Sequence, residues 1–289
     1  MCRLFGMSSA PARTRAIFWL LDAPDSLCRQ SRHQPDGTGL GYFAAGGAPR
    51  VHKSPIAAYA DRCFAQEARQ VESEMFLAHI RFASTGGLAE RNTHPFLQDG
   101  RLFAHNGVIE DLPALDAELG PARSRVQGET DSERFFTLVS RETEARGGDV
   151  AAGIEHAARW VARNLPLYAL NLIITTPDEL WALRYPDTHE LHVLDRPGGG
   201  QYGCRHLDHC GTEGRIRVHS DDLATTPATV VASERMDDNP CWRPMEPGEL
   251  LHIAPDRTLT CRIALPEEPT HRLALTDLRP EAAASQRLA

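Results

Sequence analysis

Two runs with helical periodicity lie between groups of strand-like segments, and this order constrains the fold more than any other feature. Residues 132–146 and 150–165 carry apolar side chains at helical spacing. A short apolar helix is expected at residues 16–23, and strands are expected at residues 40–43, 76–84, 101–109, 170–176, 179–185, 190–194, 229–233 and 249–253. The order strands, helices, strands predicts α+β layering, with two sheets whose outer faces are covered by helices.

The chain shows no internal repeat, and no low-complexity linker divides it before the Ala-rich stretch after Leu278. We therefore expect a single domain over residues 1–278 and a flexible tail over residues 279–289. No apolar run approaches the ~20 residues of a membrane-spanning helix, and the N-terminus lacks the features of a signal peptide. The seven cysteines are scattered and odd in number, which favours a reducing, cytoplasmic location.

Charge and lysine content exclude several classes of function. The formal net charge of -8 argues against a nucleic-acid partner, because such binding depends on clustered basic residues. Lys53 is the only lysine, and it lies in neither a phosphate-binding loop nor a Schiff-base context. A small substrate, including a zwitterionic one, fits this composition better.

Cys2 follows the initiator Met1 directly, and a residue this small normally permits removal of Met1 by an aminopeptidase. Removal leaves a thiol and a free α-amine on one residue. Because an α-amine titrates near ~7.7 to 8.0, it can accept the thiol proton close to neutral pH. Cys2 could then supply both nucleophile and base, although a cysteine at this position on its own more often has no catalytic role.

A basic residue suited to binding a carboxylate lies on the strand expected at residues 76–84. Alternation along that strand places His79 and Arg81 on the same face, and the Arg81 guanidinium offers planar, paired donors. Ser84 or Thr85 can add a hydroxyl group. The alternative is a surface arginine on an edge strand.

Two further motifs carry candidate site residues. The side-chain amide of Asn106 and the backbone N–H of Gly107 can converge on a developing oxyanion, although Asn-Gly is also a common hairpin signal. Asp131, in residues 128–133, can pair with a substrate ammonium group. Asp131 or Thr130 can equally serve as the N-cap of the helix that follows.

No metal or cofactor is expected. The cysteines and histidines of the Gly-rich segment match no established metal-binding spacing, and these are Cys204, His206, His209, Cys210 and His219. Three other histidines are expected to be structural, because an α-amine base makes a histidine base unnecessary, and these are His79, His94 and His105.

Taken in order, the four motifs around Cys2, Arg81, Asn106-Gly107 and Asp131 resemble those of class II glutamine amidotransferases, in the N-terminal nucleophile hydrolase superfamily. The resemblance extends over about residues 1–255. It is nearest to stand-alone members such as the γ-glutamyl hydrolase of ergothioneine biosynthesis. It implies a four-layer αββα sandwich, with the second residue on an early strand at the mouth between the sheets.

The resemblance also implies the roles of these residues. Cys2 attacks the amide, Arg81 holds the substrate carboxylate, Asn106 and Gly107 form the oxyanion hole, and Asp131 holds the α-amine. Two departures from the family pattern stand out. Arg32 is displaced from the position of the family's loop arginine, so it is assigned no role, and Phe82 replaces a tryptophan found in sugar-synthesising relatives.

The expected reaction is hydrolysis of a γ-glutamyl amide through a cysteine thioester, which releases glutamate and ammonia or an amine. The partner is then a small γ-glutamyl molecule, with a separate ammonia-accepting enzyme left open. Other readings are a catalytically inactive γ-glutamyl or amino-acid binding module, and an acylase acting on a non-glutamyl amide. The pair of opposite charges at Arg81 and Asp131 argues against the acylase, whose substrates lack a zwitterion to bind.

Overall fold

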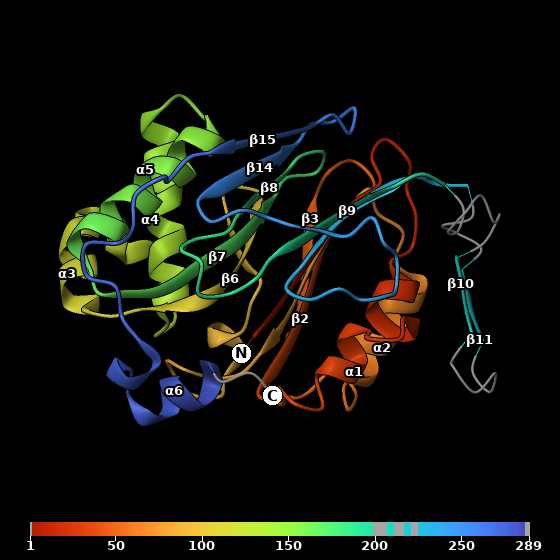
Figure 1. Cartoon of the computed structure of the whole chain (residues 1–289), viewed down its shortest axis with the longest axis horizontal. Helices are drawn as coiled ribbons and strands as arrows, with labels where there is room; N and C mark the ends of the chain where they lie inside the picture. Colours follow the sequence, from red (N-terminus) through yellow and green to blue (C-terminus); the bar gives the residue numbers. More distant parts are fainter. Residues whose placement is uncertain (1, 199–206, 211–216, 221–224, 287–289) are drawn as a thin grey trace.

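The computed structural model describes residues 2–198, 207–210, 217–220 and 225–286. Two antiparallel sheets lie face to face at the centre of the molecule, and helices cover the outer face of each (Figure 1). This arrangement confirms the predicted α+β, four-layer αββα sandwich. Within the described residues, no helix is long and apolar enough to cross a membrane.

The first sheet has seven strands, and the strand that follows Cys2 lies in its interior. Their order across the sheet is β13 (Arg243–Pro244), β9 (His192–Arg196), β12 (Ala228–Ala232), β1 (Arg3–Ser8), β4 (Met75–Arg81), β2 (Gly37–Phe43) and β3 (Pro49–Ser54). Its outer face is covered by η1 (Phe18–Asp22), α1 (Leu27–Gln30) and α2 (Arg62–Gln70). Phe18, Trp19 and Phe64 from these helices are fully buried against strand residues such as Phe5 and Phe76.

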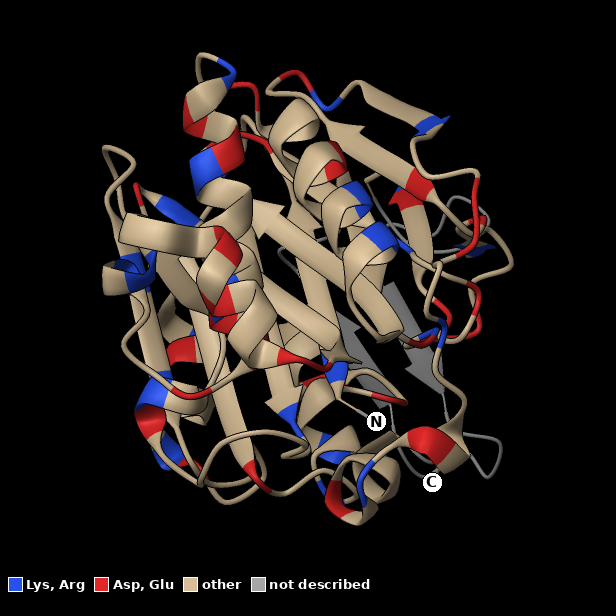
Figure 2. Cartoon of the chain, turned by 90° about the vertical axis from the view of Figure 1, so that its left-hand side faces the viewer, with Lys and Arg blue, Asp and Glu red and all other residues tan. Residues whose placement is uncertain are grey.

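The second sheet has six strands in the order β15 (Leu259–Ile263), β14 (Glu249–Ile253), β8 (Leu180–Leu183), β7 (Leu167–Thr175), β6 (Arg101–Ile109) and β5 (Phe96–Gln98). Helices α3 (Leu112–Leu119), α4 (Asp131–Ala145) and α5 (Val150–Asn164) cover it. In Figure 2 these helices carry charges on their outer faces, whereas the strands behind them are almost uncharged. The Phe103 ring of β6 stacks on Phe136 of α4 with centroids 4.7 Å apart, so the predicted apolar helix face is buried.

The remaining elements are short. They are the 3-10 turns η2 (Glu90–Asn92), η3 (Gly120–Arg125) and η5 (Leu275–Asp277), the separate hairpin β10 (Leu207–Cys210) and β11 (Arg217–Ser220), and helix α6 (Pro280–Gln286).

Between the two sheets lies a third apolar cluster, which includes Leu4, Leu77, Leu102 and Ile173. The sheets approach closely at Gly6 of β1, where an added Cβ would lie 2.9 Å from Leu180 Cδ1. A side chain at this position would therefore displace the side chains of Leu180 and Ile173 in the facing sheet. Because of this close approach, β1 and β4 of the first sheet pack against β6 and β7 of the second. These strands are far apart in the sequence.

The chain end differs from the expected flexible tail. Residues 280–286 form helix α6, in which Ser285 and Gln286 are buried, and the Gln286 side chain lies 2.7 Å from His189 Nε2. Leu278 and Ala282 share an apolar cluster with Val108 and Tyr168. This burial supplies the stabilisation that an Ala-rich segment lacks by itself.

Candidate functional site

The Cys2 side chain is held by the backbone of the strand beside it. Cys2 is 8% exposed and directly precedes β1, which pairs with β4. The Phe82 N–H donates to Cys2 Sγ at 3.2 Å, and the thiol donates to the Phe82 carbonyl oxygen at 3.3 Å. Burial raises the pKa of the Cys2 thiol above its ordinary value, opposed chiefly by the Phe82 hydrogen bond. The thiol is thus fixed in position and protonated at neutral pH.

Arg81 is the last residue of β4 and lies beside this thiol. It is only 3% exposed, and β4 lies between β1 and β2, so the alternative of a surface arginine on an edge strand is wrong. Its guanidinium donates to the carbonyl oxygens of Thr85 at 2.8 Å, Gly86 at 3.2 Å and Gly87 at 3.0 Å. The loop that follows β4 therefore folds back around the arginine, and burial lowers the pKa of Arg81.

A pair of side chains that the sequence did not single out holds this loop from the other side. Asn92 Nδ2 donates to the Gly87 carbonyl at 3.1 Å and to Glu129 Oε2 at 2.9 Å, while the Gly87 N–H donates to the same carboxylate at 3.2 Å. The bonds from Asn92 and Gly87 lower the pKa of Glu129 to about 2. Glu129 lies inside the motif that drew attention to Asp131, but no local signal marks Asn92.

Asp36 is a second supporting residue, from the turn of residues 34–37. Its carboxylate accepts a hydrogen bond from the Ala83 N–H at 2.9 Å. Asp36 thereby holds the backbone one residue beyond Phe82, which contacts the Cys2 thiol. The polar turn sequence was the only signal for this role.

Asn106 and Gly107 lie in the middle of β6, opposite Asn171 and Leu170 of β7, so the hairpin alternative is wrong. Asn106 is fully buried, and neither atom of its amide has a hydrogen-bond partner among the described residues. A Cβ at Gly107 would lie 1.9 Å from the Ala169 carbonyl oxygen, so only glycine fits there. A buried amide with an unused donor is what stabilisation of an oxyanion requires.

Asp131 begins α4 but is not its N-cap. That position belongs to Thr130, whose hydroxyl accepts a hydrogen bond from the Glu133 N–H at 3.2 Å. Asp131 is 2% exposed, and its Oδ2 accepts from the Ile109 N–H at 3.0 Å, two residues beyond Gly107. The negative charge of Asp131 favours the protonated form of Arg81, as would a thiolate on Cys2, so the three groups share one electrostatic environment.

A cavity of about 610 Å³ lies next to the segments that carry these groups, although Cys2, Arg81, Asn106, Gly107 and Asp131 do not themselves line it. Its wall comprises residues 83–88, which follow Phe82, residues 108–113, which follow Gly107, and Arg279, Glu281 and Ala282 at the start of α6. Ser84 and Thr85 both line it, as a substrate contact requires. The part taken by α6 could not be foreseen from a segment expected to be a flexible tail.

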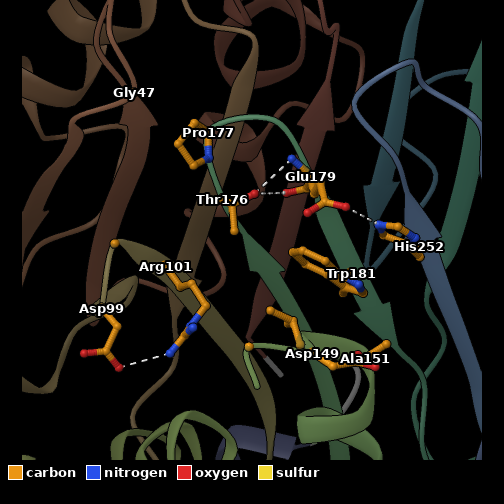
Figure 3. A pocket seen from close by; sticks show the side chains of 13 residues that line it. Gly47, Asp99, Arg101, Asp149, Ala151, Thr176, Pro177, Glu179, Trp181 and His252 are labelled. Atoms are coloured by element: carbon orange, nitrogen blue, oxygen red, sulfur yellow. Dashed lines mark hydrogen bonds and ion pairs between the residues drawn. The ribbon is translucent and has the colours of Figure 1, made fainter. Parts of the chain in front are cut away.

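A second cavity, also of about 610 Å³, lies elsewhere and contains none of the four motifs (Figure 3). It borders Arg101, the first residue of β6, five residues before Asn106. In it the Trp181 ring stacks on His252 with centroids 4.9 Å apart, and His252 Nε2 lies 2.9 Å from a Glu179 oxygen. Residues 83–88 of the first cavity directly follow Phe82, whose backbone holds the Cys2 thiol, so we place the chemistry in the first cavity.

The buried histidines are neutral. The rings of His79 and His94 lie 4.1 Å apart, and burial lowers the pKa of His79 to about 3 and that of His94 well below its ordinary value. His105 Nδ1 lies 2.9 Å from the Ser132 hydroxyl, and burial lowers its pKa too. They therefore add no charge beside Asn106.

No group of three or more His, Cys, Asp or Glu side chains in the described part of the chain could hold a metal ion. Cys204 and His206 lie outside the described residues. The side chains of His209, Cys210 and His219, on β10 and β11, are likewise not described.

The sequence profile of the family described as "Glutamine amidotransferases class-II" matches residues 1–272. The chain belongs to the class II glutamine amidotransferases. As a member of this family it is an enzyme, which disfavours the non-catalytic binding module. The predicted family is therefore confirmed.

Three curated relatives each cover between 78% and 88% of this amidotransferase. An uncharacterized protein of Methanocaldococcus jannaschii is 30% identical over 78% of the chain, which spans 63% of that protein's length. The putative glutamine amidotransferase YafJ of Escherichia coli is 27% identical over 86% of the chain and 96% of its own length. The gamma-glutamyl-hercynylcysteine sulfoxide hydrolase of Mycolicibacterium smegmatis is 27% identical over 88% and 96%.

Solved structures confirm the fold. The glutamine phosphoribosylpyrophosphate amidotransferase from B. subtilis superposes with a TM-score of 0.63 at 20% identity, over 92% of this chain and 50% of that one. The glutamine aminotransferase class-II domain protein from Silicibacter pomeroyi superposes with a TM-score of 0.59 at 20% identity, over 90% and 98%.

Proposed function

We propose that this amidotransferase hydrolyses a γ-glutamyl amide through a thioester on Cys2. The observation that carries the proposal is the thiol itself, which is held at 3.2 Å by the Phe82 N–H beside buried Arg81. The loop that starts at the next residue forms one wall of the cavity. The Cys2 thiol therefore contacts the short segment of residues 81–88, which also carries the carboxylate-binding Arg81 and one wall of the cavity.

The reaction then proceeds in two stages. With Met1 removed, the Cys2 α-amine takes the thiol proton, and the sulfur attacks the γ-carbonyl carbon. Asn106 and Gly107 stabilise the resulting oxyanion. When the C–N bond breaks, the leaving amine takes the proton back from the α-ammonium. Water then attacks the thioester, glutamate leaves, and the thiol is restored.

Arg81 and Asp131 hold the glutamyl portion. The loop carbonyls use three of the five guanidinium N–H donors, two on Nη2 and one on Nη1, which leaves two donors for the substrate carboxylate. Asp131 accepts from the Ile109 N–H on Oδ2, and its Oδ1 accepts only a long hydrogen bond from the Ser132 hydroxyl at 3.5 Å, so Oδ1 can also accept from the substrate ammonium. Ser84 or Thr85 adds a hydroxyl contact from the cavity wall.

The relatives leave the leaving group open. One of them is named a hydrolase of a γ-glutamyl conjugate, and another a putative glutamine amidotransferase. Transfer of ammonia to a separate enzyme remains the second candidate, because the chain matches half of an amidotransferase that acts with phosphoribosylpyrophosphate.

The test is glutamate release from glutamine and from γ-glutamylcysteine derivatives by the purified enzyme and by Cys2→Ala. We expect loss of release in Cys2→Ala and normal release in Cys63→Ala, a matched control at an exposed cysteine. Intact mass should show removal of Met1 and one covalent adduct with 6-diazo-5-oxonorleucine, absent in Cys2→Ala. Retained Met1 in an active enzyme would overturn the mechanism.

A further inference from the structure

Two charged side chains at the start of α6 line the cavity, Arg279 just before the helix and Glu281 within it. Arg279 and Glu281 are exposed, and neither side chain has an ion-pair or hydrogen-bond partner among the described residues. Elsewhere on this surface Arg residues are commonly paired, as with Arg272 and Glu268 at 2.7 Å. Two unpaired charges at a cavity rim are available to a ligand.

These two charges are held in place by the packing of the helix. Ala282, next to Glu281, and Leu278, next to Arg279, are buried in one cluster with Val108 of β6. At the other end of α6, the Gln286 side chain contacts His189. This packing therefore holds both charges in a fixed position, in a segment that Figure 1 shows near the N-terminal end of the chain.

The layout of the cavity determines which part of a substrate meets α6. The groups proposed to hold the glutamyl portion are buried, with Arg81 and Asp131 only 3% and 2% exposed. The α6 wall is exposed, so the substituent on the γ-amide nitrogen faces it. A cavity of about 610 Å³ is in the range that holds drug-sized ligands, about 300–1,000 Å³, and far exceeds what an unsubstituted amide needs.

The charged side chains that line the cavity are predominantly negative. Glu110 and Asp111 line it at the end of β6, and with Glu281 they set three carboxylates against the one guanidinium of Arg279. Building on the proposed function, we propose that Glu281 and Arg279 select the leaving group, and that the preferred leaving amine carries a second positive charge. Glu281 attracts that charge and Arg279 opposes it, so the two residues act with opposite sign.

The experiment compares two γ-glutamyl amides of equal length, γ-glutamyl-1,4-diaminobutane and γ-glutamyl-n-pentylamide, and measures the ratio of their kcat/KM values. We expect the ratio to favour the diamine in the wild-type enzyme. Glu281→Gln should lower this ratio about two- to five-fold and Arg279→Gln should raise it by a similar factor, as single exposed charges do. Raising the ionic strength from about 0.05 M to about 0.5 M should shrink both effects.

Arg163→Gln and Glu267→Gln are the matched controls, because this exposed pair, 3.6 Å apart, lines neither cavity described above. Neither control should change the ratio. A wild-type ratio near one, or a shift in the same direction for Glu281→Gln and Arg279→Gln, would overturn this inference alone. Hydrolysis of neither amide nor of glutamine would instead overturn the proposed function.

Discussion

At the scale of single residues, the buried side-chain amide of Asn106 lowers the stability of the fold. Each unsatisfied polar atom in a protein interior costs about 1–3 kcal/mol, and both amide atoms of Asn106 lack a partner in the described structure. The neighbouring position tolerates only glycine. Such a cost is expected where the partner is a transient oxyanion and not another part of the fold.

Replacing Asn106 by leucine separates catalysis from stability. Asn106→Leu keeps the side-chain size and removes the unsatisfied amide, so the free energy of unfolding should stay the same or increase. The value of kcat should fall about 10²–10³-fold, as for loss of one oxyanion donor. Urea titration and steady-state kinetics measure the two quantities, and an unchanged kcat would remove Asn106 from the mechanism.

The dependence of kcat/KM on pH reports the base. Because burial raises the pKa of the Cys2 thiol, a free thiolate is scarce at neutral pH and the α-amine must accept the proton. We expect kcat/KM to rise with pH through an apparent pKa near ~7.7 to 8.0, the range of an α-amine. Reductive methylation of that amine should shift this limb, and a profile that rises only above pH 9 would point to the thiol alone.

At the scale of elements, the pairing of β6 with β7 places the oxyanion donors. A methyl group at Gly107 would clash with the Ala169 carbonyl, which is rigid backbone. Gly107→Ala should therefore separate the strands and lower the free energy of unfolding by roughly 1–3 kcal/mol, the usual cost of overpacking. Gly87→Ala is the control for stability, because its added Cβ would meet only a Glu129 oxygen at 4.0 Å. Thermal unfolding of both variants decides the point.

The loop after β4 should depend on Glu129. Hydrogen bonds keep its pKa at about 2, so its hold on Gly87 is fully present above its ordinary pKa near 4.5 and is lost as the pH falls toward 2. Glu129→Gln keeps an oxygen acceptor but removes the charge. We expect KM for the γ-glutamyl substrate to rise several-fold with little change in kcat, because the loop orders the surroundings of Arg81. A fall in kcat alone would contradict this role.

At the scale of the whole molecule, neutral histidines buried between the sheets couple folding to pH. In the unfolded chain His79 titrates near 6.5, whereas in the folded protein its pKa is about 3. The unfolded state therefore binds more protons below pH 6.5, and stability falls as the pH drops from 6.5 toward 3. His79 alone should contribute a slope of about 1.4 kcal/mol per pH unit.

Urea titrations at pH 7 and pH 5 measure this slope. In His79→Asn, which cannot gain a proton, the decrease in unfolding free energy between these pH values should be smaller than in the wild type. His156→Asn is the control, because that histidine is 57% exposed. Equal pH dependence in the wild type and His79→Asn would show that His79 titrates normally in the fold.

The sequence by itself determined local features, namely the positions of most helices and strands and the short motifs that mark the family. The apolar periodicity of residues 132–146 and 150–165 placed α4 and α5 to within about one residue. Most predicted strands lie where they were expected, and the order of four short motifs identified the family. The strand of β1 was not predicted from pattern, because both of its faces are buried and it shows no alternation of polar and apolar residues. Two other strands that are buried on both faces, β4 and β7, were predicted, because their apolar runs are longer than that of β1.

Only the tertiary structure decided how distant segments combine. The clamp of Asn92 and Glu129 joins residues 37 positions apart, and Cys2 contacts Phe82 across 80. The Ala-rich end was expected to be flexible, yet it forms α6, because its apolar side chains are buried against β6 and not by any signal of their own. Contacts between segments far apart in the chain are fixed by packing of the two sheets, and no local pattern encodes them.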